Sequence, residues 1–248
     1  MTHWSLTDLW TMPRPSDPHA RARLLDAARA VFSDRGLDRA KVEDITSRAQ
    51  LSKGAFYLHF ESKEEAFREL LAGVVSHLEQ LINESSDEQL AIGPGDSTFQ
   101  AYLDACHRKN VEIYEFIWEN RALMAMVLEG GGSASYQHLI EDFAERAQRQ
   151  TAVLVQHGVD IGLYRTDLDL DITSAFLAGG FDRLARQLVR EPKKPDIDAM
   201  MREAERLFLG GIARPDVLVV LNREDQKLSG KQAVVRGGGL AGRGALSG

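Results

Sequence analysis

The most constraining feature of the chain is the segment 51–63, which reads Leu-Ser-Lys-Gly-Ala-Phe-Tyr-Leu-His-Phe-Glu-Ser-Lys. Ser52 can begin a helix, because its hydroxyl can accept a hydrogen bond from an N–H of the first turn that otherwise has no partner. A second capping signal, Ser62 with Glu65 three residues later, begins another helix almost at once. The helix between these signals is therefore very short, and it carries hydrogen-bond donors and little bulk. Such a helix suits insertion into the major groove of DNA.

Two helical patterns precede this segment. Asp17-Pro18 is a typical helix start. An apolar stripe at helical spacing follows, made of Leu24, Leu25, Ala28, Val31 and Phe32, and Gly36 ends it. A shorter helical pattern is made by Val42, Ile45 and Ala49. The turn falls at Gln50-Leu51-Ser52, and Phe56 and Phe60 can fill the core between the helices. Three helices joined by tight turns, the last one short, are typical of a helix-turn-helix domain.

The stretch from Arg23 to Phe67 resembles the DNA-binding domain of the tetracycline-repressor (TetR) family of bacterial regulators. The residues that carry the resemblance are Ala27, Ala28, Phe32, Gly36, Val42, Ile45, Ser52, Gly54, Phe56, Tyr57, His59, Phe60, Ser62, Lys63 and Glu64. It implies an all-α protein with an N-terminal three-helix helix-turn-helix DNA-binding domain and a C-terminal helical ligand-binding and dimerisation bundle. It also implies a homodimer on a palindromic operator in double-stranded DNA, released by an unknown small-molecule effector.

Several positions depart from the family pattern. Gln50 stands where the turn usually carries glycine, and a left-handed backbone there would cost about 1 kcal/mol. Lys41 stands at the usual threonine or serine cap of the second helix, and Thr46 replaces an alanine. Glu43 suits the positive end of the helix dipole but would repel a nearby phosphate.

The expected DNA-contacting residues come from the short helix and its flanks. Lys53, Ala55 and Tyr57 are expected at base edges and the nearby backbone. Lys41, His59 and Lys63 are expected to hold phosphates, while Ser52 and Gly54 permit a close approach.

The charge distribution agrees with this assignment, although the formal net charge of the 248 residues is −7. Residues 14–63 hold ten Lys/Arg against seven Asp/Glu, whereas residues 64–213 hold 14 against 26. The slightly basic N-terminal part is therefore the one expected to dock on DNA. Cys106 is the only cysteine and lies on an apolar stripe, which favours a buried structural thiol in a reducing cytoplasm. No signal peptide and no membrane-spanning stretch is recognisable, so a cytoplasmic protein is expected.

Beyond residue 63 the pattern is helical almost throughout. We expect a flexible extension over 1–16, the helix-turn-helix domain over 17–63, a helical effector-binding and dimerisation domain over 64–213, and a flexible tail over 214–248. The first body helix is expected to end near Ile82, with a loop over 83–96. Gly130-Gly131-Gly132 is expected to be a break, and Val217–Leu221 resembles a strand.

Two sets of body residues are candidates for function. An effector pocket could be lined by large, adaptable side chains with polar edges, namely Tyr102, Tyr114, Trp118, Met124, Met126, Phe143 and Phe181. Two late amphipathic helices are the expected dimer interface, with Phe176, Gly179, Gly180, Leu184, Leu188, Met201 and Phe208. For any one of these residues, a place in an ordinary core is the competing interpretation.

No catalytic or metal-binding pattern emerges. The seven histidines are dispersed and lack metal-ligand spacing, so we expect no enzyme, no metal and no cofactor. Two alternatives remain to the ligand-released repressor. One is a helical ligand- or protein-binding module with a degenerate head, and the other is a regulator of the same fold that no ligand gates.

Overall fold

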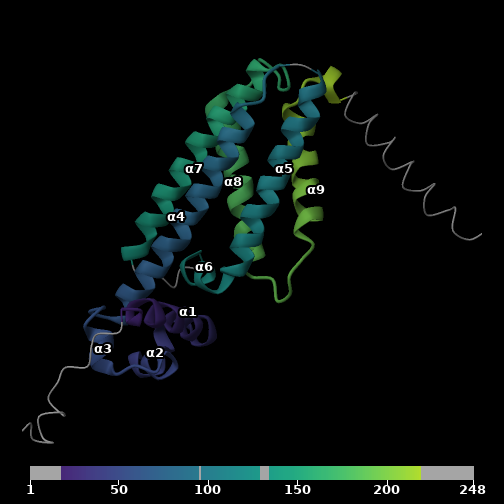
Figure 1. The fold of residues 1–248 in the computed structure, drawn as a ribbon. Helices are drawn as coiled ribbons and strands as arrows, with labels where there is room; N and C mark the ends of the chain where they lie inside the picture. Colours follow the sequence, from purple (N-terminus) through teal and green to yellow (C-terminus); the bar gives the residue numbers. More distant parts are fainter. Residues whose placement is uncertain (1–17, 95, 129–133, 219–248) are drawn as a thin grey trace, which may run out of the picture. The chain divides into compact units, whose positions relative to one another are not determined.

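The computed structural model describes residues 18–94, 96–128 and 134–218 (Figure 1). Within these ranges the chain forms nine helices and no β-strand, which confirms the expected all-α fold. A single bridging contact joins Tyr164 and Ala213. The helices are α1 (Ala20–Arg39), α2 (Val42–Ala49), α3 (Lys53–Tyr57), α4 (Lys63–Leu90), α5 (Asp96–Glu119), α6 (Arg121–Leu128), α7 (Ala134–Asp160), α8 (Leu170–Leu188) and α9 (Ile197–Ile212).

The chain divides into two compact units. The first runs to His77 and includes Glu119–Glu141, and the second comprises Leu78–Trp118 with the chain from Asp142 onward. The helix-turn-helix elements all lie in the first unit, and α4 and α7 each contribute residues to both. None of the helices in the described ranges is long and apolar enough to cross a membrane.

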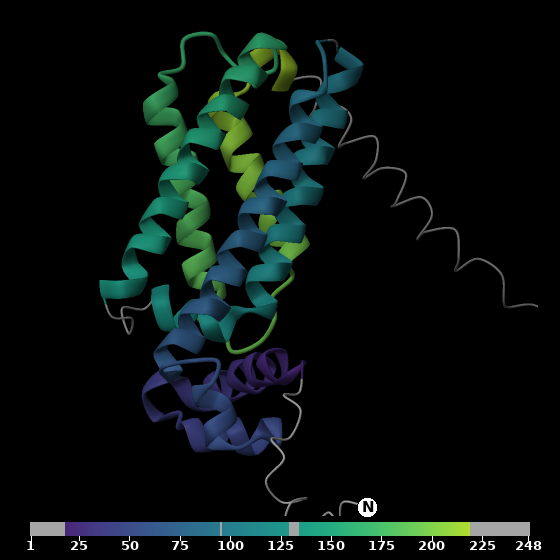
Figure 2. The same ribbon diagram turned by 60° about the vertical axis from the view of Figure 1, so that its left-hand side comes forward.

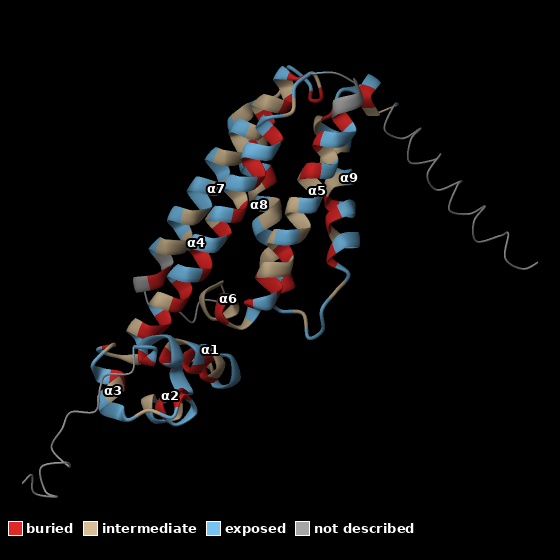
Figure 3. Cartoon of the chain, in the orientation of Figure 1, coloured by how far each residue is buried: buried red, intermediate tan, exposed pale blue. Residues whose placement is uncertain are grey.

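Aromatic side chains form much of the core of the first unit. Phe32 of α1 meets Phe67 of α4 edge to face, with ring centroids 5.5 Å apart, and Tyr136 packs on the other side of Phe67 at 5.2 Å. Phe56 and Phe60 are fully buried beside each other. Figure 3 shows this buried interior in red, within helices whose outer faces are exposed. These contacts fix α3 and the start of α4 onto α1.

Most local signals of the helix-turn-helix act as the sequence predicts, although α1 begins at Ala20 rather than at Pro18 and continues beyond Gly36 to Arg39. Gly36 interrupts α1 with a φ of 75°, and Gln50 takes up the left-handed conformation, with φ 54° and ψ 43°, that ends α2. Lys41 gives no side-chain cap to α2. Asp44 instead accepts a hydrogen bond from the N–H of Lys41 at 3.2 Å, so α2 begins without the usual hydroxyl.

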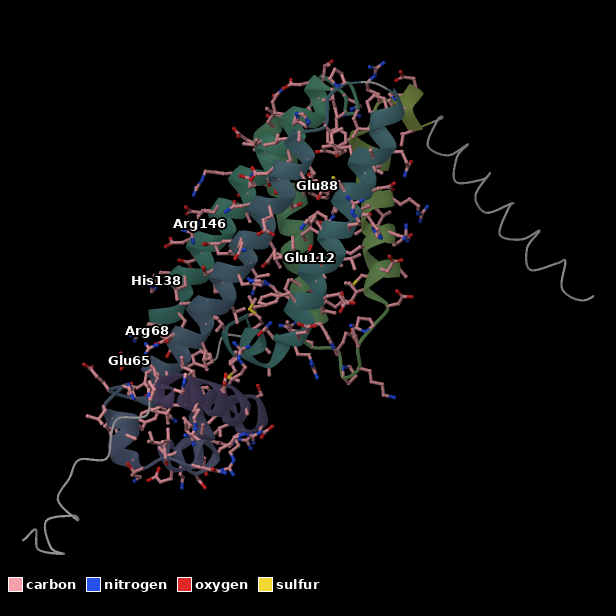
Figure 4. All side chains as sticks on the ribbon, in the orientation of Figure 1. Glu65, Arg68, Glu88, Glu112, His138 and Arg146 are labelled. Atoms are coloured by element: carbon pink, nitrogen blue, oxygen red, sulfur yellow. The ribbon has the colours of Figure 1, made fainter. Side chains whose placement is uncertain are left out.

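The second unit is a bundle built from α5, α8, α9 and the later parts of α4 and α7 (Figure 2). Tyr102 of α5 is buried in its core, and its hydroxyl donates to the carbonyl of Leu154 at 3.3 Å. Ion pairs on the surface join neighbouring helices, such as Arg146 of α7 with Glu79 of α4 (Figure 4 labels Arg146). The core of this unit comprises Phe99, Tyr102, Val155, Ile161, Leu163, Tyr164, Leu177 and Val217.

Several expected boundaries were wrong. The first body helix does not end near Ile82, because α4 continues to Leu90 through buried Ser85, Ser86 and Gln89. These polar side chains break the apolar stripe, yet the hydroxyl of Ser86 stays within the helix by donating to the carbonyl of Ile82 at 2.8 Å.

The end of the described chain also differs from expectation. Residues 215–218 form a helical turn rather than part of a strand, with Val217 buried in the core of the second unit. The N-terminal extension, the Gly130–Gly132 break and the tail beyond residue 218 lie outside the described residues.

Candidate DNA-binding surface

The short helix α3 is held at both ends and along its inner side. Ser52 precedes it, and its hydroxyl accepts a hydrogen bond from the N–H of Ala55 at 3.1 Å, as the sequence predicted. Phe56 and Phe60 anchor the inner side in the core. Ser62 then opens α4 by accepting from the N–H of Glu65 at 3.1 Å. The helix is thus rigidly presented despite its five residues.

The outer side of α3 carries most of the residues expected to meet DNA. Tyr57 is 57% exposed, and its ring lies against the edge of Phe56 at 5.5 Å. Ser52, Lys53 and Gly54 are exposed as well, while Ala55 and His59 are half-buried. The structure therefore brings these six predicted residues together on one short element.

Gly54 has no internal reason to be glycine. A Cβ added there would meet only the Ser52 hydroxyl, at an ordinary contact distance of 3.7 Å. The protein's own packing would accept a larger residue, so the absence of a side chain is consistent with close approach by another molecule.

Several lysine and arginine side chains of the first unit form ion pairs. Lys53 at the start of α3 pairs with Glu43 in the first turn of α2. Arg35 of α1 reaches Asp44 at 2.7 Å. Lys41, at the beginning of α2, has an exposed side chain, so its charge faces solvent as the predicted phosphate contact requires.

Lys63 does not extend toward solvent as the sequence predicted. Its ammonium donates hydrogen bonds to the carbonyl oxygens of Leu37, Asp38 and Ala40 at 2.8, 3.0 and 3.0 Å. An ammonium group has three donors, so all of them are occupied at the end of α1. In the free protein Lys63 therefore stabilises the turn between α1 and α2, and its expected role as a phosphate contact is corrected to a structural one.

Sequence reasoning missed Leu58, which is 80% exposed at the end of α3. It was overlooked because it has no donor or acceptor. The four-residue spacing of Phe56 and Phe60 was the signal that could have revealed Leu58, since burial of both rings leaves the side chains between them on the outer side. An exposed leucine beside Tyr57 can contact a thymine methyl group or a sugar.

The predicted effector-pocket residues are divided between the two units. Met124 and Met126 belong to the first unit, whereas the other five belong to the second. Tyr114 of α5 meets Phe181 of α8, donating to its carbonyl at 2.6 Å with the rings 6.3 Å apart. Tyr102 lies in a core cluster with Tyr164, and Phe208, which contacts Phe181, packs against this cluster.

Trp118 is buried, and Phe143 of α7 is half-buried. The structure thus buries three of the five second-unit residues, Tyr102, Tyr114 and Trp118, and places Tyr114 in contact with Phe181.

Burial governs the titratable groups around Tyr102. It raises the pKa of the Tyr102, Tyr114 and Tyr164 hydroxyls, so all three stay neutral. It also raises the pKa of the Cys106 thiol to about 12, with the nearby charge of Glu205 acting in the same direction. Cys106 is half-buried rather than fully buried as the sequence predicted, and its raised pKa keeps the thiol protonated at neutral pH.

The predicted interface residues separate into two groups. Phe176 is 74% exposed and Gly179 is exposed, and no atom lies within 4 Å of a Cβ built on Gly179. Leu188 and Met201 are 1% and 0% exposed, so the prediction that they form an interface was wrong and they belong to the protomer's core.

The remaining interface residues have partners within the protomer. Phe208 packs on Phe181 with centroids 5.2 Å apart and approaches Gly180, and Leu184 is half-buried. Ile172 and Leu207, which were not predicted, are 69% and 65% exposed on α8 and α9.

The geometry of α2 and α3 defines a class of protein. A capped, aromatic-anchored α3 follows α2 across a left-handed turn, and its outer side carries lysine, tyrosine and a bare glycine backbone. This is a helix-turn-helix DNA-binding protein with a separate helical unit.

Comparisons with known proteins agree. Residues 24–70 match the profile of "Bacterial regulatory proteins, tetR family". The chain is 27% identical to the HTH-type transcriptional repressor KstR2 of Rhodococcus jostii over 212 residues, which cover 82% of this chain and 98% of that protein.

Two solved structures have the same architecture. The ketosteroid transcriptional regulator KstR2 of Mycobacterium tuberculosis superposes with a TM-score of 0.57 at 25% identity, over 80% of this chain and 97% of the other. SmeT, the repressor of the Stenotrophomonas maltophilia multidrug efflux pump SmeDEF, gives a TM-score of 0.62 at 21% identity, over 79% and 92%. The chain is a TetR-like DNA-binding transcriptional regulator, and the relatives that it matches are transcriptional regulators rather than enzymes.

Proposed function

We propose that the protein is a repressor that binds a palindromic operator as a homodimer and leaves it when a small molecule binds the helical body. The observation that carries the DNA-binding part is α3 itself. Its inner residues Phe56 and Phe60 are buried, whereas Lys53, Tyr57 and Leu58 project from it. Two such helices related by a two-fold axis would enter successive major grooves about 34–36 Å apart. The proposal places the protein in the cytoplasm with the DNA.

Support for a homodimer comes from α8. Ile172, Phe176 and Gly179 recur at four- and three-residue spacing, so they lie on one face of the helix. The two large side chains are mostly exposed, and the bare backbone at Gly179 leaves room for a second helix. A two-fold contact would bury this face against its copy.

Support for release by a ligand comes from the link between α1 and α6. Arg29 of α1 donates to the side-chain oxygen of Asn120 at 2.6 Å, and Asn120 lies where α5 ends and α6 begins. A ligand that alters the end of α5 would therefore bias the position of α1, and with it the DNA-binding helices. Such a ligand acts by stabilising one of two pre-existing arrangements.

The competing interpretation of a degenerate head rests on Gln50, on Glu43 and on the weak positive charge balance of the N-terminal part. Gln50 adopts the left-handed turn without disrupting α2 or α3, so the departure from glycine leaves the motif intact. A regulator that no ligand gates remains the alternative, and an effector screen on the protein–DNA complex would distinguish the two.

The decisive experiment is fluorescence anisotropy of the full-length protein on its own upstream DNA and on a scrambled duplex, at two salt concentrations. Preference for the upstream duplex that persists at the higher salt supports a sequence-reading regulator, because nonspecific binding is mainly electrostatic. If a folded dimer binds neither that duplex nor one recovered by in vitro selection, the proposal is wrong.

A further inference from the structure

The ion pair between α2 and α3 lies within the proposed DNA-binding surface. Lys53 contacts a carboxylate oxygen of Glu43, and the two side chains are 54% and 56% exposed. The hydrogen bond from Lys53 is the main cause of a lowered pKa for the Glu43 carboxyl, and the same bond raises the pKa of Lys53. Both groups are thus charged at neutral pH and engaged with each other, on the surface from which α3 projects.

This pairing changes what Lys53 can do on DNA. A free lysine at the start of a recognition helix would neutralise a phosphate on any sequence and release a condensed counterion. Paired with Glu43, it contributes no net charge, and the carboxylate repels phosphates that approach it. Lys41 also lies close enough to lower the pKa of Glu43, so the carboxylate opposes two of the predicted DNA contacts.

The free-energy cost of bringing the Glu43 carboxylate against DNA depends on the DNA sequence. A carboxylate in the major groove can accept a hydrogen bond from the N4 amine of cytosine, while a lysine can donate to O6 or N7 of guanine. On a matching sequence both members of the pair therefore gain new partners. On other sequences the carboxylate loses water without gaining a donor, which is unfavourable.

We propose that Glu43 is a specificity-determining residue, which weakens binding to random DNA by holding Lys53 and is compensated only on the cognate operator. The inference rests on the proposed docking of α3. It adds to that docking a role for Glu43, whose carboxylate repels DNA phosphates. Discrimination by a penalty on the wrong partner is a general route to specificity.

The test compares Glu43→Gln, Lys53→Met and the double variant on two duplexes, one recovered by in vitro selection with the wild-type protein and one random. For Glu43→Gln we expect roughly three- to tenfold tighter binding to the random duplex near 0.1 M salt. The slope of log K against log salt should steepen by about 0.9, the value for one added phosphate contact. Affinity for the selected duplex should rise less, so the specificity ratio falls.

The controls separate the possible failures. If Glu43 acts through Lys53, the Glu43→Gln gain should shrink by more than half in the Lys53→Met background. Asp34→Asn is the matched control, because it removes an exposed carboxylate that pairs with Arg48 at 3.7 Å without touching α3.

If Asp34→Asn increases affinity for the random duplex equally, the change in net charge alone explains the effect, and the proposal is overturned. An unchanged random-duplex affinity and salt slope in Glu43→Gln would overturn it as well. If Lys53→Met leaves binding to the selected duplex unchanged, the docking of α3 itself is wrong. Circular dichroism of each variant confirms that it is folded.

Discussion

Lys63 illustrates how a single residue can stabilise the DNA-binding unit in the free protein. Gly36 breaks α1, and the chain then turns toward α2, leaving carbonyl oxygens that the helix does not use. The ammonium of Lys63 satisfies three of them from the first position of α4. The lysine thereby ties together the two ends of the helix-turn-helix.

We predict that Lys63→Met lowers the free energy of unfolding by about 1.5–3 kcal/mol, the usual contribution of hydrogen bonds to a charged group. Methionine preserves the length of the side chain but donates nothing to the three carbonyls. Urea unfolding monitored by circular dichroism measures the change. Lys41→Met is the control, because its side chain is exposed and its loss should change stability by less than about 0.5 kcal/mol. Unaltered stability in Lys63→Met, accompanied by weaker DNA binding, would restore the phosphate-contact interpretation.

Cys106 offers a second test at the residue scale. Its raised pKa of about 12 means that very little thiolate exists at pH 8, whereas an ordinary cysteine, with a pKa near 8.5, is partly ionised there. We predict that the native protein reacts with a thiol reagent about a thousandfold more slowly than the denatured chain. The denatured protein should titrate one thiol per chain. Rapid labelling of the folded protein would show that the thiol is accessible and ionised.

At the scale of elements, the chain packs so closely at the end of α7 that Gly158 has no space for a side chain. The carbonyl of Gly158 accepts from the N–H groups of Leu163 and Tyr164 at 2.9 and 3.0 Å, which folds the chain back on the helix. A Cβ at Gly158 would lie 2.2 Å from the ring of Tyr164. Because that ring is buried, it has little room to move.

We therefore predict that Gly158→Ala destabilises the protein by about 1–3 kcal/mol through overpacking. For a chain of this size that corresponds to a Tm lower by about 2–10 °C. Gly73→Ala is the matched control: Gly73 is exposed within α4 and a Cβ there meets nothing within 4 Å. It should raise stability by about 0.5–1 kcal/mol. Equal Tm values for the two variants would contradict the proposed packing.

The elements differ in how far the sequence predicts them. The start of α3 was correctly predicted because the signal is local: Ser52 caps its own turn. The length of α4 was not, since buried Ser86 and Gln89 obscure its apolar stripe and depend on partners within the helix. The prediction that Met201 lies in an interface failed for a different reason. Met201 and Phe176 have similar hydrophobicity, and only tertiary packing buries one and exposes the other.

The candidate site follows the same division. The position of Lys53 and Tyr57 on the outer side of α3 could be predicted from the segment alone, because Phe56 and Phe60 define the inner side of a short helix. The carbonyl partners of Lys63 lie more than 20 residues away in the sequence, so no local pattern could reveal them. Glu43 was recognised as repulsive to phosphate, but its pairing with Lys53 required the spatial arrangement of α2 and α3.

At the scale of the whole molecule, the proposed homodimer determines how DNA is read. One short helix makes few contacts, so a single protomer would bind DNA weakly. Two linked copies convert the second contact into an intramolecular event and increase affinity without a new contact. The exposed face of α8 is where we propose this linkage, since each buried large apolar side chain contributes about 1.5–3 kcal/mol and a two-fold interface counts each twice.

We predict that Phe176→Asp yields a folded monomer, because the interface would bury two carboxylates without partners. Sedimentation velocity should show the change from dimer to monomer, and affinity for the selected duplex should fall at least tenfold while circular dichroism stays unchanged. Val153→Asp is the matched control, since Val153 is 48% exposed on α7 and should leave the dimer intact. Gly179→Leu provides a second variant. A Cβ at this position meets nothing within 4 Å in the protomer, and the leucine side chain would hold two α8 helices apart. A dimer that survives both Phe176→Asp and Gly179→Leu would exclude this face of α8 as the interface.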